Sequence, residues 1–289
     1  MRLILLTSVV LVAFASNSIL NRLAVGPGHI DPYTFALIRA FAGAVFLAAL
    51  VLARRRVLPL LTRSRIAGAG SLTLYLVGFS VAYVDIDAGL GALILFGGVQ
   101  VTMFAGGVIE GERPPLRRWI GAALALIGLA WLGWPSGAAA LPLVATAAML
   151  AAALGWGIYS LAGRAASDPM AETGANFIWS VPLLVAVYLL FPVEMDVAGA
   201  NLFGIVLAIV AGAITSGLGY ALWYGVLPQL GASTAALLQL LVPVIAAVGG
   251  VLLLGEVVSW RMVGAGALTL GGIAYGLGVF QRKLRSNTS

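Results

Sequence analysis

Arg39 is the residue whose predicted position, inside an apolar segment, is the most unfavourable in free energy. It stands about two turns inside the apolar segment Pro32–Ala53. A cation with apolar neighbours on both sides needs a partner, and such positions are often binding sites. Arg39 could contact a solute directly. It could also gate or anchor one end of its helix by pairing with a nearby carboxylate: Asp31, Asp85 or Asp87. The sequence leaves both interpretations open.

Three amide side chains, Asn17, Gln100 and Gln239, stand in the middle of other apolar segments. Asn17 shares one helical face with Ser18 and Asn21, because the spacing brings these side chains to the same side. An amide has donors and acceptors that fit a carboxylate or an amine, and the same groups join two helices equally well. We therefore expect the amides either to line a solute cavity or to bond neighbouring helices.

Aromatic side chains form the larger part of the predicted binding site. Tyr75, Phe79 and Tyr83 repeat every fourth residue and so follow one face of a helix. Tyr75, Trp156 and Tyr159 lie deep in their segments, where a hydroxyl or an indole N–H requires a partner, and rings with polar tips suit planar or amphipathic solutes. Trp179 lies in the seventh segment, and Tyr220 lies nearer the end of the eighth. The predicted substrate-binding residues are Asn17, Tyr75, Phe79, Tyr83, Gln100, Trp156, Tyr159, Trp179, Tyr220 and Gln239.

The composition of the whole chain explains why these polar groups stand out. Of 289 residues, 62% are hydrophobic and only 9% are charged, with a mean hydropathy of +1.08. Soluble domains are about half apolar and about a quarter charged, so this is an all-α integral membrane protein. The net charge of +6 is expected on cytoplasmic loops rather than at nucleic acid. The chain has no cysteine, which excludes disulfides and thiolate metal sites, and we expect neither metal nor cofactor.

Ten apolar spans are predicted to position the polar groups. They are Leu3–Val25, Pro32–Ala53, Ile66–Val84, Ala88–Ile109, Leu116–Trp134, Pro142–Gly163, Thr173–Phe191, Leu202–Trp223, Gly231–Leu254 and Met262–Phe280. Most of the 16 Lys and Arg residues fall on one side of the membrane if the chain starts inside. The positive-inside rule then predicts a multi-pass protein of a bacterial-type cytoplasmic (inner) membrane with both termini cytoplasmic.

The order of the spans indicates an internal duplication of the sequence. A shift of 144 positions lays Ala88–Glu112 on Ala232–Glu256 with several identities, and a shift of 142 lays Phe14 and Arg22 on Trp156 and Arg164. Five spans per copy is an odd number, so the second copy must cross the membrane upside down. We therefore predict two inverted five-helix repeats, residues 1–137 and 138–289, around a central cavity.

Two places in the duplicated spans should bend. Pro243 removes a backbone hydrogen bond from its helix, and the equivalent first-half position is Val99, next to Gly97 and Gly98. Together with Arg39, the residues Pro243, Gly97 and Gly98 are the predicted gating or helix-bending residues.

Several of these marks together resemble one known group of transporters. They are Gly111-Glu112 and Gly255-Glu256 closing the duplicated spans, Pro243, Pro32 with Arg39, Gly155-Trp156 and the run from Gly219 to Tyr224. This sequence resembles the drug/metabolite transporter superfamily, specifically its EamA-type members with ten helices in two repeats, and is most similar to the bacterial aromatic amino acid exporters of the YddG type. The resemblance implies a carrier that exports small amphipathic metabolites, aromatic or other neutral amino acids first, by alternating access.

The middle thirds of the spans contain no Asp, Glu or His. Tight proton coupling usually relies on such a group, so facilitative or exchange transport is expected. The alternatives are export of a different metabolite or drug and, with no HExxH, GxSxG or deep acid pair in support, an intramembrane enzyme. The expected partners are a small-molecule substrate and the lipid bilayer. Small residues are spread over most spans, so the sequence indicates no particular homodimer face.

Overall fold

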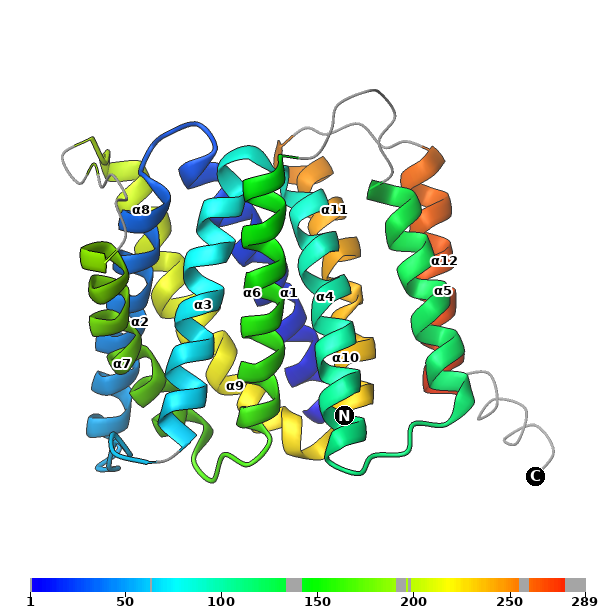
Figure 1. Cartoon of the computed structure of the whole chain (residues 1–289), viewed down its shortest axis with the longest axis horizontal. Helices are drawn as coiled ribbons and strands as arrows, with labels where there is room; N and C mark the ends of the chain where they lie inside the picture. The colour runs from blue at the N-terminus through cyan, green and yellow to red at the C-terminus, as the bar shows by residue number, and fades with distance from the viewer. Residues whose placement is uncertain are drawn as a thin grey trace.

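The structure is a computed structural model of the chain that describes residues 2–62, 64–133, 142–190, 196, 199–254 and 260–278. Within these residues all regular secondary structure is helical, and the long helices run roughly along one direction in a single bundle (Figure 1). Some sequence predictions fall outside the described residues: the span ends Trp134, Phe191 and Phe280, and the pair Gly255-Glu256.

The helices follow the predicted spans closely. The first five are α1 Arg2–Val25, α2 Pro32–Ala53, α3 Ser64–Asp85, α4 Ala88–Ile109 and α5 Leu116–Gly133. The next are α6 Leu143–Gly163, α7 Pro169–Leu190, α8 Leu202–Val210, the π-helix η1 Ala211–Leu218, α9 Gly219–Val226 and the 3₁₀ turn η2 Leu227–Gln229. The last are α10 Ala232–Gln239, α11 Leu241–Leu254 and α12 Trp260–Leu277.

Eight helical stretches of the described residues are long and apolar enough to cross a membrane. Two of them are composite: Leu202–Gln229 runs from α8 through η2, and Ala232–Gly249 joins α10 to the larger part of α11. Val263–Leu277 in α12 is a shorter apolar helix. It packs along α5, and the two lie together at one edge of the bundle (Figure 1). The protein is therefore a multi-pass, all-helical membrane protein.

The duplicated spans differ in how they bend. The helix breaks between α10 and α11, where Leu240 is a turn residue. Pro243 explains the break, because its nitrogen has no hydrogen to donate to the carbonyl of Gln239 and its ring clashes sterically with that carbonyl. No break accompanies Gly97 and Gly98, because α4 runs through both without interruption, and their gating role stays a prediction. Gly98 instead serves close packing: a Cβ there would lie 2.7 Å from Cβ of Ala153 on α6.

The arginine-bearing loops gather at one end of the bundle. The loops 54–62, 110–115 and 164–168 lie at the edge of the view where α1 begins and α12 ends (Figure 1). We call this the basic end. The described ends of the chain therefore lie on the same side of the bundle, and the helices between them alternate in direction.

Candidate functional site

The start of α2 explains how Arg39 reaches the interior. Asp31 caps this helix, since its Oδ1 accepts hydrogen bonds from the amides of Tyr33 (3.0 Å) and Thr34 (2.9 Å), and Pro32 takes the first helical position. Arg39 follows about two turns later on the face that packs against η1 and α7. Its side chain is 0% exposed.

Three neutral hydroxyl groups surround the Arg39 guanidinium. Nε donates to Ser216 Oγ at 2.8 Å, and Nη2 donates to the hydroxyls of Tyr220 at 2.7 Å and Tyr75 at 3.2 Å. The guanidinium carbon also lies over the rings of Tyr75 (5.4 Å) and Phe79 (5.2 Å), within cation–π range. Nη1 is buried and has no hydrogen-bond partner among the described residues.

The predicted pairing of Arg39 with a nearby acid is wrong. Asp31 is used as the helix cap, Asp85 is exposed, and Asp87 pairs with Arg22 at 3.3 Å. These carboxylates stay at the end of the bundle opposite the basic end, while α2 carries Arg39 inward beyond their reach. Arg39 therefore does not snorkel, and no ion pair to a described acid anchors it.

Asn17 holds the other side of the same polar group. Its Oδ1 accepts hydrogen bonds from Thr215 Oγ1 (2.6 Å) and Ser216 Oγ (3.1 Å), and its Nδ2 donates to the carbonyl of Thr215 (3.2 Å). Thr215 and Ser216 lie in the π-helix η1, whose wider turn changes the direction of the side chains around it. The amide of Asn17 thus bonds two elements together, α1 and η1, beside the Arg39 guanidinium.

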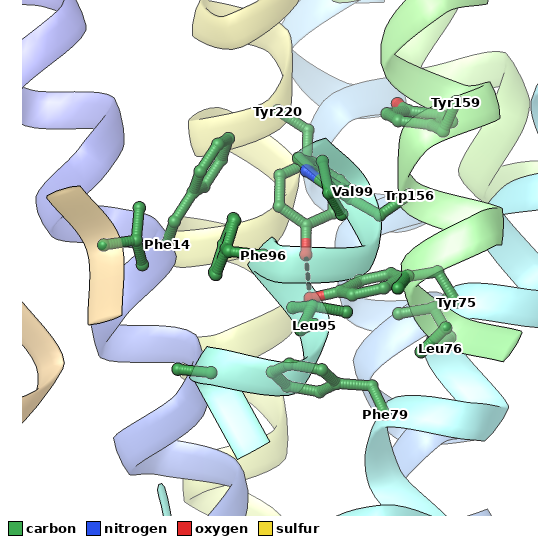
Figure 2. Close-up of a cluster of buried hydrophobic side chains, with 14 of the residues drawn as sticks. Phe14, Tyr75, Leu76, Phe79, Leu95, Phe96, Val99, Trp156, Tyr159 and Tyr220 are labelled. Atoms are coloured by element: carbon green, nitrogen blue, oxygen red, sulfur yellow. Dashed lines mark hydrogen bonds between the residues drawn. The ribbon is translucent and has the colours of Figure 1, made fainter. Parts of the chain in front are cut away.

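Aromatic rings pack directly against this polar group, since the Arg39 guanidinium lies over Tyr75 and Phe79. Figure 2 shows how these rings lie together with their aromatic neighbours. We call Phe14, Tyr75, Phe79, Trp156, Tyr159 and Tyr220 the aromatic cluster. The centroid of Trp156 lies 4.5 Å from that of Tyr220, 5.0 Å from Phe14 and 5.1 Å from Tyr75. The Tyr220 hydroxyl donates to that of Tyr75 at 3.1 Å, the dashed line in Figure 2. At these distances the rings touch, so in this conformation the rings themselves fill the space between them.

Residues 1–137 and 138–289 contribute equally to the aromatic cluster. Phe14 comes from α1, and Tyr75 and Phe79 come from α3; Trp156 and Tyr159 come from α6, and Tyr220 comes from α9. The predicted binding residue Tyr83 extends the row along α3, with its ring 4.7 Å from that of Phe79.

Gln239 joins the aromatic cluster from α10. Its Oε1 accepts the indole N–H of Trp156 at 2.7 Å, and its Nε2 donates to Met103 Sδ on α4 at 3.0 Å. The break after α10 therefore directly follows a residue bonded to the site. The other predicted amide, Gln100, is also buried, but neither of its polar atoms has a hydrogen-bond partner within the described residues.

A small polar cavity lies between the aromatic cluster and the basic end. It has a volume of about 130 Å³ and is lined by Arg65, Gly68, Ala162, Ala165, Ala166, Glu172, Asn176 and Tyr224. Arg65 pairs with Glu172 at 2.8 Å and also donates to the Asn176 side chain. The ring of Tyr224 stacks on Tyr159 with centroids 4.7 Å apart, which connects this cavity to the aromatic cluster.

Trp179 is one predicted binding residue that the structure does not bring to the site. It is 39% exposed, and its indole N–H donates to the carbonyl of Leu60 at 2.9 Å. It lines a separate apolar groove of about 640 Å³ between α3 and α7. Trp179 faces away from the aromatic cluster, because Phe177 and Ser180 occupy the buried face of α7.

Sequence reasoning missed Thr215 and Ser216, which bind Asn17 and Arg39. The signal was present: two adjacent hydroxyl residues interrupt the apolar run of the predicted span Leu202–Trp223. The same rule that selected Asn17 selects them, since polar groups in a membrane helix face the protein interior. Asn176 satisfies the same rule in α7.

Glu112 closes the basic end next to the site. It accepts hydrogen bonds from the amides of Ala232 (2.6 Å) and Ser233 (3.2 Å) at the start of α10, and pairs with Arg164 at 2.8 Å. Partial burial opposes ionisation, but these two amides and Arg164 outweigh it and hold the pKa of the Glu112 carboxyl below its usual value. In the part of the chain described here, no cluster of three or more His, Asp or Glu residues could hold a metal ion.

Comparison with known proteins gives a consistent family. An uncharacterized protein of Pseudomonas aeruginosa is 44% identical over 274 residues, which cover 94% of this chain and 93% of the relative. An uncharacterized transporter of Archaeoglobus fulgidus is 24% identical over 249 residues, covering 84% and 88%. A solved crystal structure matches with a TM-score of 0.72 at 20% identity, covering 93% of this chain and 98% of the other, which supports the fold alone.

The pattern of the EamA-like transporter family matches the chain twice, over residues 1–134 and again over residues 143–276. These matches cover most of the multi-pass helical bundle. The chain therefore belongs to the EamA-like transporter family and is a membrane transporter.

Proposed function

We propose that this transporter exports small amphipathic metabolites, aromatic or other neutral amino acids first, by alternating access. The observation that carries the proposal is the aromatic cluster, in which rings from residues 1–137 and 138–289 meet around a buried cation. A planar solute would replace some of the ring-to-ring contacts with equivalent contacts of its own. The transport site would open when the two halves separate at one end at a time.

Two inverted five-helix repeats, residues 1–137 and 138–289, form the moving parts of this proposal. The starts of α2 and α7 support the inversion. A shift of 137 positions lays Asp31-Pro32 on Asp168-Pro169, and both aspartates cap the helix that follows. Figure 1 shows α2 running toward the basic end and α7 running away from it. The same cap therefore starts two helices of opposite direction, as an inverted repeat requires.

Close helix crossings support the same relationship. A Cβ on Gly212 of η1 would lie 2.2 Å from the carbonyl oxygen of Arg39, and a Cβ on Gly68 of α3 would lie 2.5 Å from Oδ1 of Asn176. The shift of 137 that relates α2 to α7 lays Arg39 on Asn176, and a shift of 144 lays Gly68 on Gly212. Each half thus packs a glycine of one span against the equivalent residue of the other half.

The energy source in this proposal is the solute gradient or exchange. No Asp or Glu is buried within the described residues, and the buried ionisable groups near the aromatic cluster are an arginine and tyrosines. Such a site offers no carboxylate that would load and release a proton during the cycle.

The proposed orientation has the basic end in the cytoplasm of a bacterial-type inner membrane, following the positive-inside rule. Both termini would then be cytoplasmic. Single cysteines placed at Arg2 and Asn287 of this cysteine-free chain test it: a membrane-impermeant maleimide added to intact cells should label neither. Labelling of one terminus alone would contradict the inverted repeat.

Counterflow in proteoliposomes tests the cargo. Vesicles loaded with unlabelled phenylalanine or tryptophan should accumulate the labelled amino acid transiently, and the uptake should saturate. Absence of flux for every aromatic amino acid would remove this substrate class, and saturable flux of another metabolite or a drug would support the alternative cargo.

A further inference from the structure

Arg39 is a buried cation that has no anion beside it among the residues that the structure describes. Its hydrogen bonds go to Ser216, Tyr220 and Tyr75, and all three acceptors are neutral hydroxyls. The other arginine buried in the described part of the chain, Arg65, pairs with Glu172 at 2.8 Å. Burying an ion without a counter-ion is strongly unfavourable, so the charge of Arg39 is left to be balanced by something that is not part of the described chain.

The guanidinium also keeps a donor free. Nη1 is buried and has no hydrogen-bond partner among the described residues, although the neighbouring Nη2 has two. A carboxylate binds an arginine best through two parallel N–H donors, and a guanidinium with an unused nitrogen can offer that geometry after a small shift of the hydroxyls.

Two of these hydroxyls donate their own hydrogen atoms to groups other than Arg39. Ser216 donates to Asn17, and Tyr220 donates to Tyr75. An anion can therefore take over the guanidinium donors while this network of hydroxyls and amide stays bonded.

The helix crossing itself does not require a cation. Gly212 meets only backbone atoms of Arg39, namely its carbonyl oxygen, carbonyl carbon and Cα, so the guanidinium takes no part in that contact. At the repeat-equivalent position of the second half, a neutral amide, Asn176, packs on Gly68 through its side chain. The charge at Arg39 therefore has a role that packing of α2 does not explain.

The surroundings select the kind of anion. Arg39 lies over the rings of Tyr75 and Phe79, and Trp156 lies 5.1 Å from Tyr75. An aromatic group joined to a carboxylate by a short chain can bind the guanidinium while its ring packs in the aromatic cluster. No buried Asp or Glu in the described residues offers a matching anion for an ammonium group.

We propose that Arg39 is the anion-binding group of the transport site and that the site requires a carboxylate on its aromatic ligand but not an ammonium group. The inference rests on the proposed function in taking the aromatic cluster as the transport site. It adds that a deaminated aromatic acid binds at least as well as the amino acid, while the decarboxylated amine does not bind. Since Arg39 is fully buried, the ligand reaches it only when the two halves separate.

A ligand series on the purified wild-type protein tests this without any variant. The series is 3-phenylpropionate, phenylalanine, 2-phenylethylamine and 3-phenylpropanol, and the measurement is the midpoint of thermal unfolding as a function of ligand concentration. The two carboxylates should raise the midpoint, because a ligand that binds the folded state stabilises it. The amine and the alcohol should leave it unchanged. An equal shift with 2-phenylethylamine, or no shift with 3-phenylpropionate, would overturn the proposal.

Variants then assign the effect to Arg39. Arg39→Met should abolish the carboxylate shift, and Arg39→Lys, which keeps the charge but loses the fork geometry, should weaken binding about 10- to 100-fold. The matched control is Arg54→Met, at an exposed arginine that ends the same helix, which should keep the full response. A full response in Arg39→Met would refute the assignment, and the wild-type series decides the matter if that variant does not fold.

The outcomes separate this inference from the proposed function. Carboxylate-dependent stabilisation that is lost in Arg39→Met supports the inference even if no aromatic amino acid is transported. Saturable phenylalanine counterflow that persists with the same half-saturation in Arg39→Met supports the cargo and refutes the role of Arg39.

Discussion

The guanidinium of Arg65 on α3 lies 2.8 Å from the carboxylate of Glu172 on α7 and so joins residues 1–137 to residues 138–289 at the basic end. Arg56 with Asp168, and Arg164 with Glu110 and Glu112, join the same two halves at the same end. The remaining ion pair of the described residues, Arg22 with Asp87, lies within the first half at the other end. We interpret these pairs as the closed form of the basic end, and they predict which contacts must break when that end opens.

Glu172→Gln should destabilise this closed form. Arg65 would lose its counter-ion while keeping Asn176 and the carbonyl of Pro59 (2.6 Å), so the free energy of unfolding should fall by about 1–3 kcal/mol. Thermal or denaturant unfolding in detergent measures it. Arg56→Gln breaks an exposed pair and should change stability by no more than about 0.5 kcal/mol. Equal effects of the two changes would mean that burial of the Arg65 pair is unimportant.

Stability should depend on pH through Glu112. Its pKa is lower in the folded protein, because amide hydrogen bonds and Arg164 outweigh partial burial. The carboxylate therefore stabilises the fold above its unfolded pKa, and this contribution disappears as pH falls through the folded value. As pH falls from neutral to about pH 3, the midpoint of thermal unfolding should decrease less in Glu112→Gln than in the wild type. Parallel curves for the two proteins would contradict this assignment.

Gly212→Ala should be poorly tolerated. Its new Cβ would lie 2.2 Å from the carbonyl oxygen of Arg39 and 2.9 Å from that residue's Cα, so the backbones of η1 and α2 must move apart. We expect a loss of about 1–3 kcal/mol in the free energy of unfolding. Gly266→Ala in α12 is the control, since nothing lies within 4 Å of its new Cβ and alanine is the better helix former. A Gly212→Ala protein as stable as this control would show that the crossing is looser than described.

Trp156 should contribute through its ring more than through its N–H. Trp156→Phe loses the 2.7 Å hydrogen bond to Gln239 but keeps ring contacts, so phenylalanine counterflow should fall about fivefold. Trp156→Leu also loses the contacts with Phe14 and Tyr220, and the flux should fall more than about tenfold. Trp119→Leu, at a half-exposed tryptophan of α5, should leave the half-saturation concentration unchanged. If the Trp119 change matched the Trp156→Leu change, the site would be elsewhere.

The helices were predictable because their signals are local. Asp31-Pro32 starts α2 at the expected residue, and the predicted span Ala88–Ile109 coincides with α4. The predicted start at Thr173 is one turn late, because Glu172 lowers hydropathy there while Asp168 caps the helix before it. Composition and periodicity therefore identified the membrane class and nearly all helix ends that the structure describes.

The contacts between helices were less predictable because they depend on rotation about each helix axis. The spacing of Tyr75 and Phe79 correctly indicates a shared face, but nothing local shows that Ser216, 177 positions from Arg39, lies within 2.8 Å of it. A π-helix changes that rotation within η1, and hydropathy does not detect it. The position of Trp179 away from the aromatic cluster has the same cause, since depth in a span does not reveal which face a ring occupies.

Labelling of two single cysteines tests alternating access most directly, because the chain has no cysteine of its own. Ala162→Cys reports on the cavity at the basic end, and Ser80→Cys reports on the buried hydroxyl that accepts from Asn21 toward the other end. When Glu172→Gln is added to each, maleimide labelling should become faster at position 162 and slower at position 80. Rates that rise together at both positions would contradict a transporter that opens one end at a time.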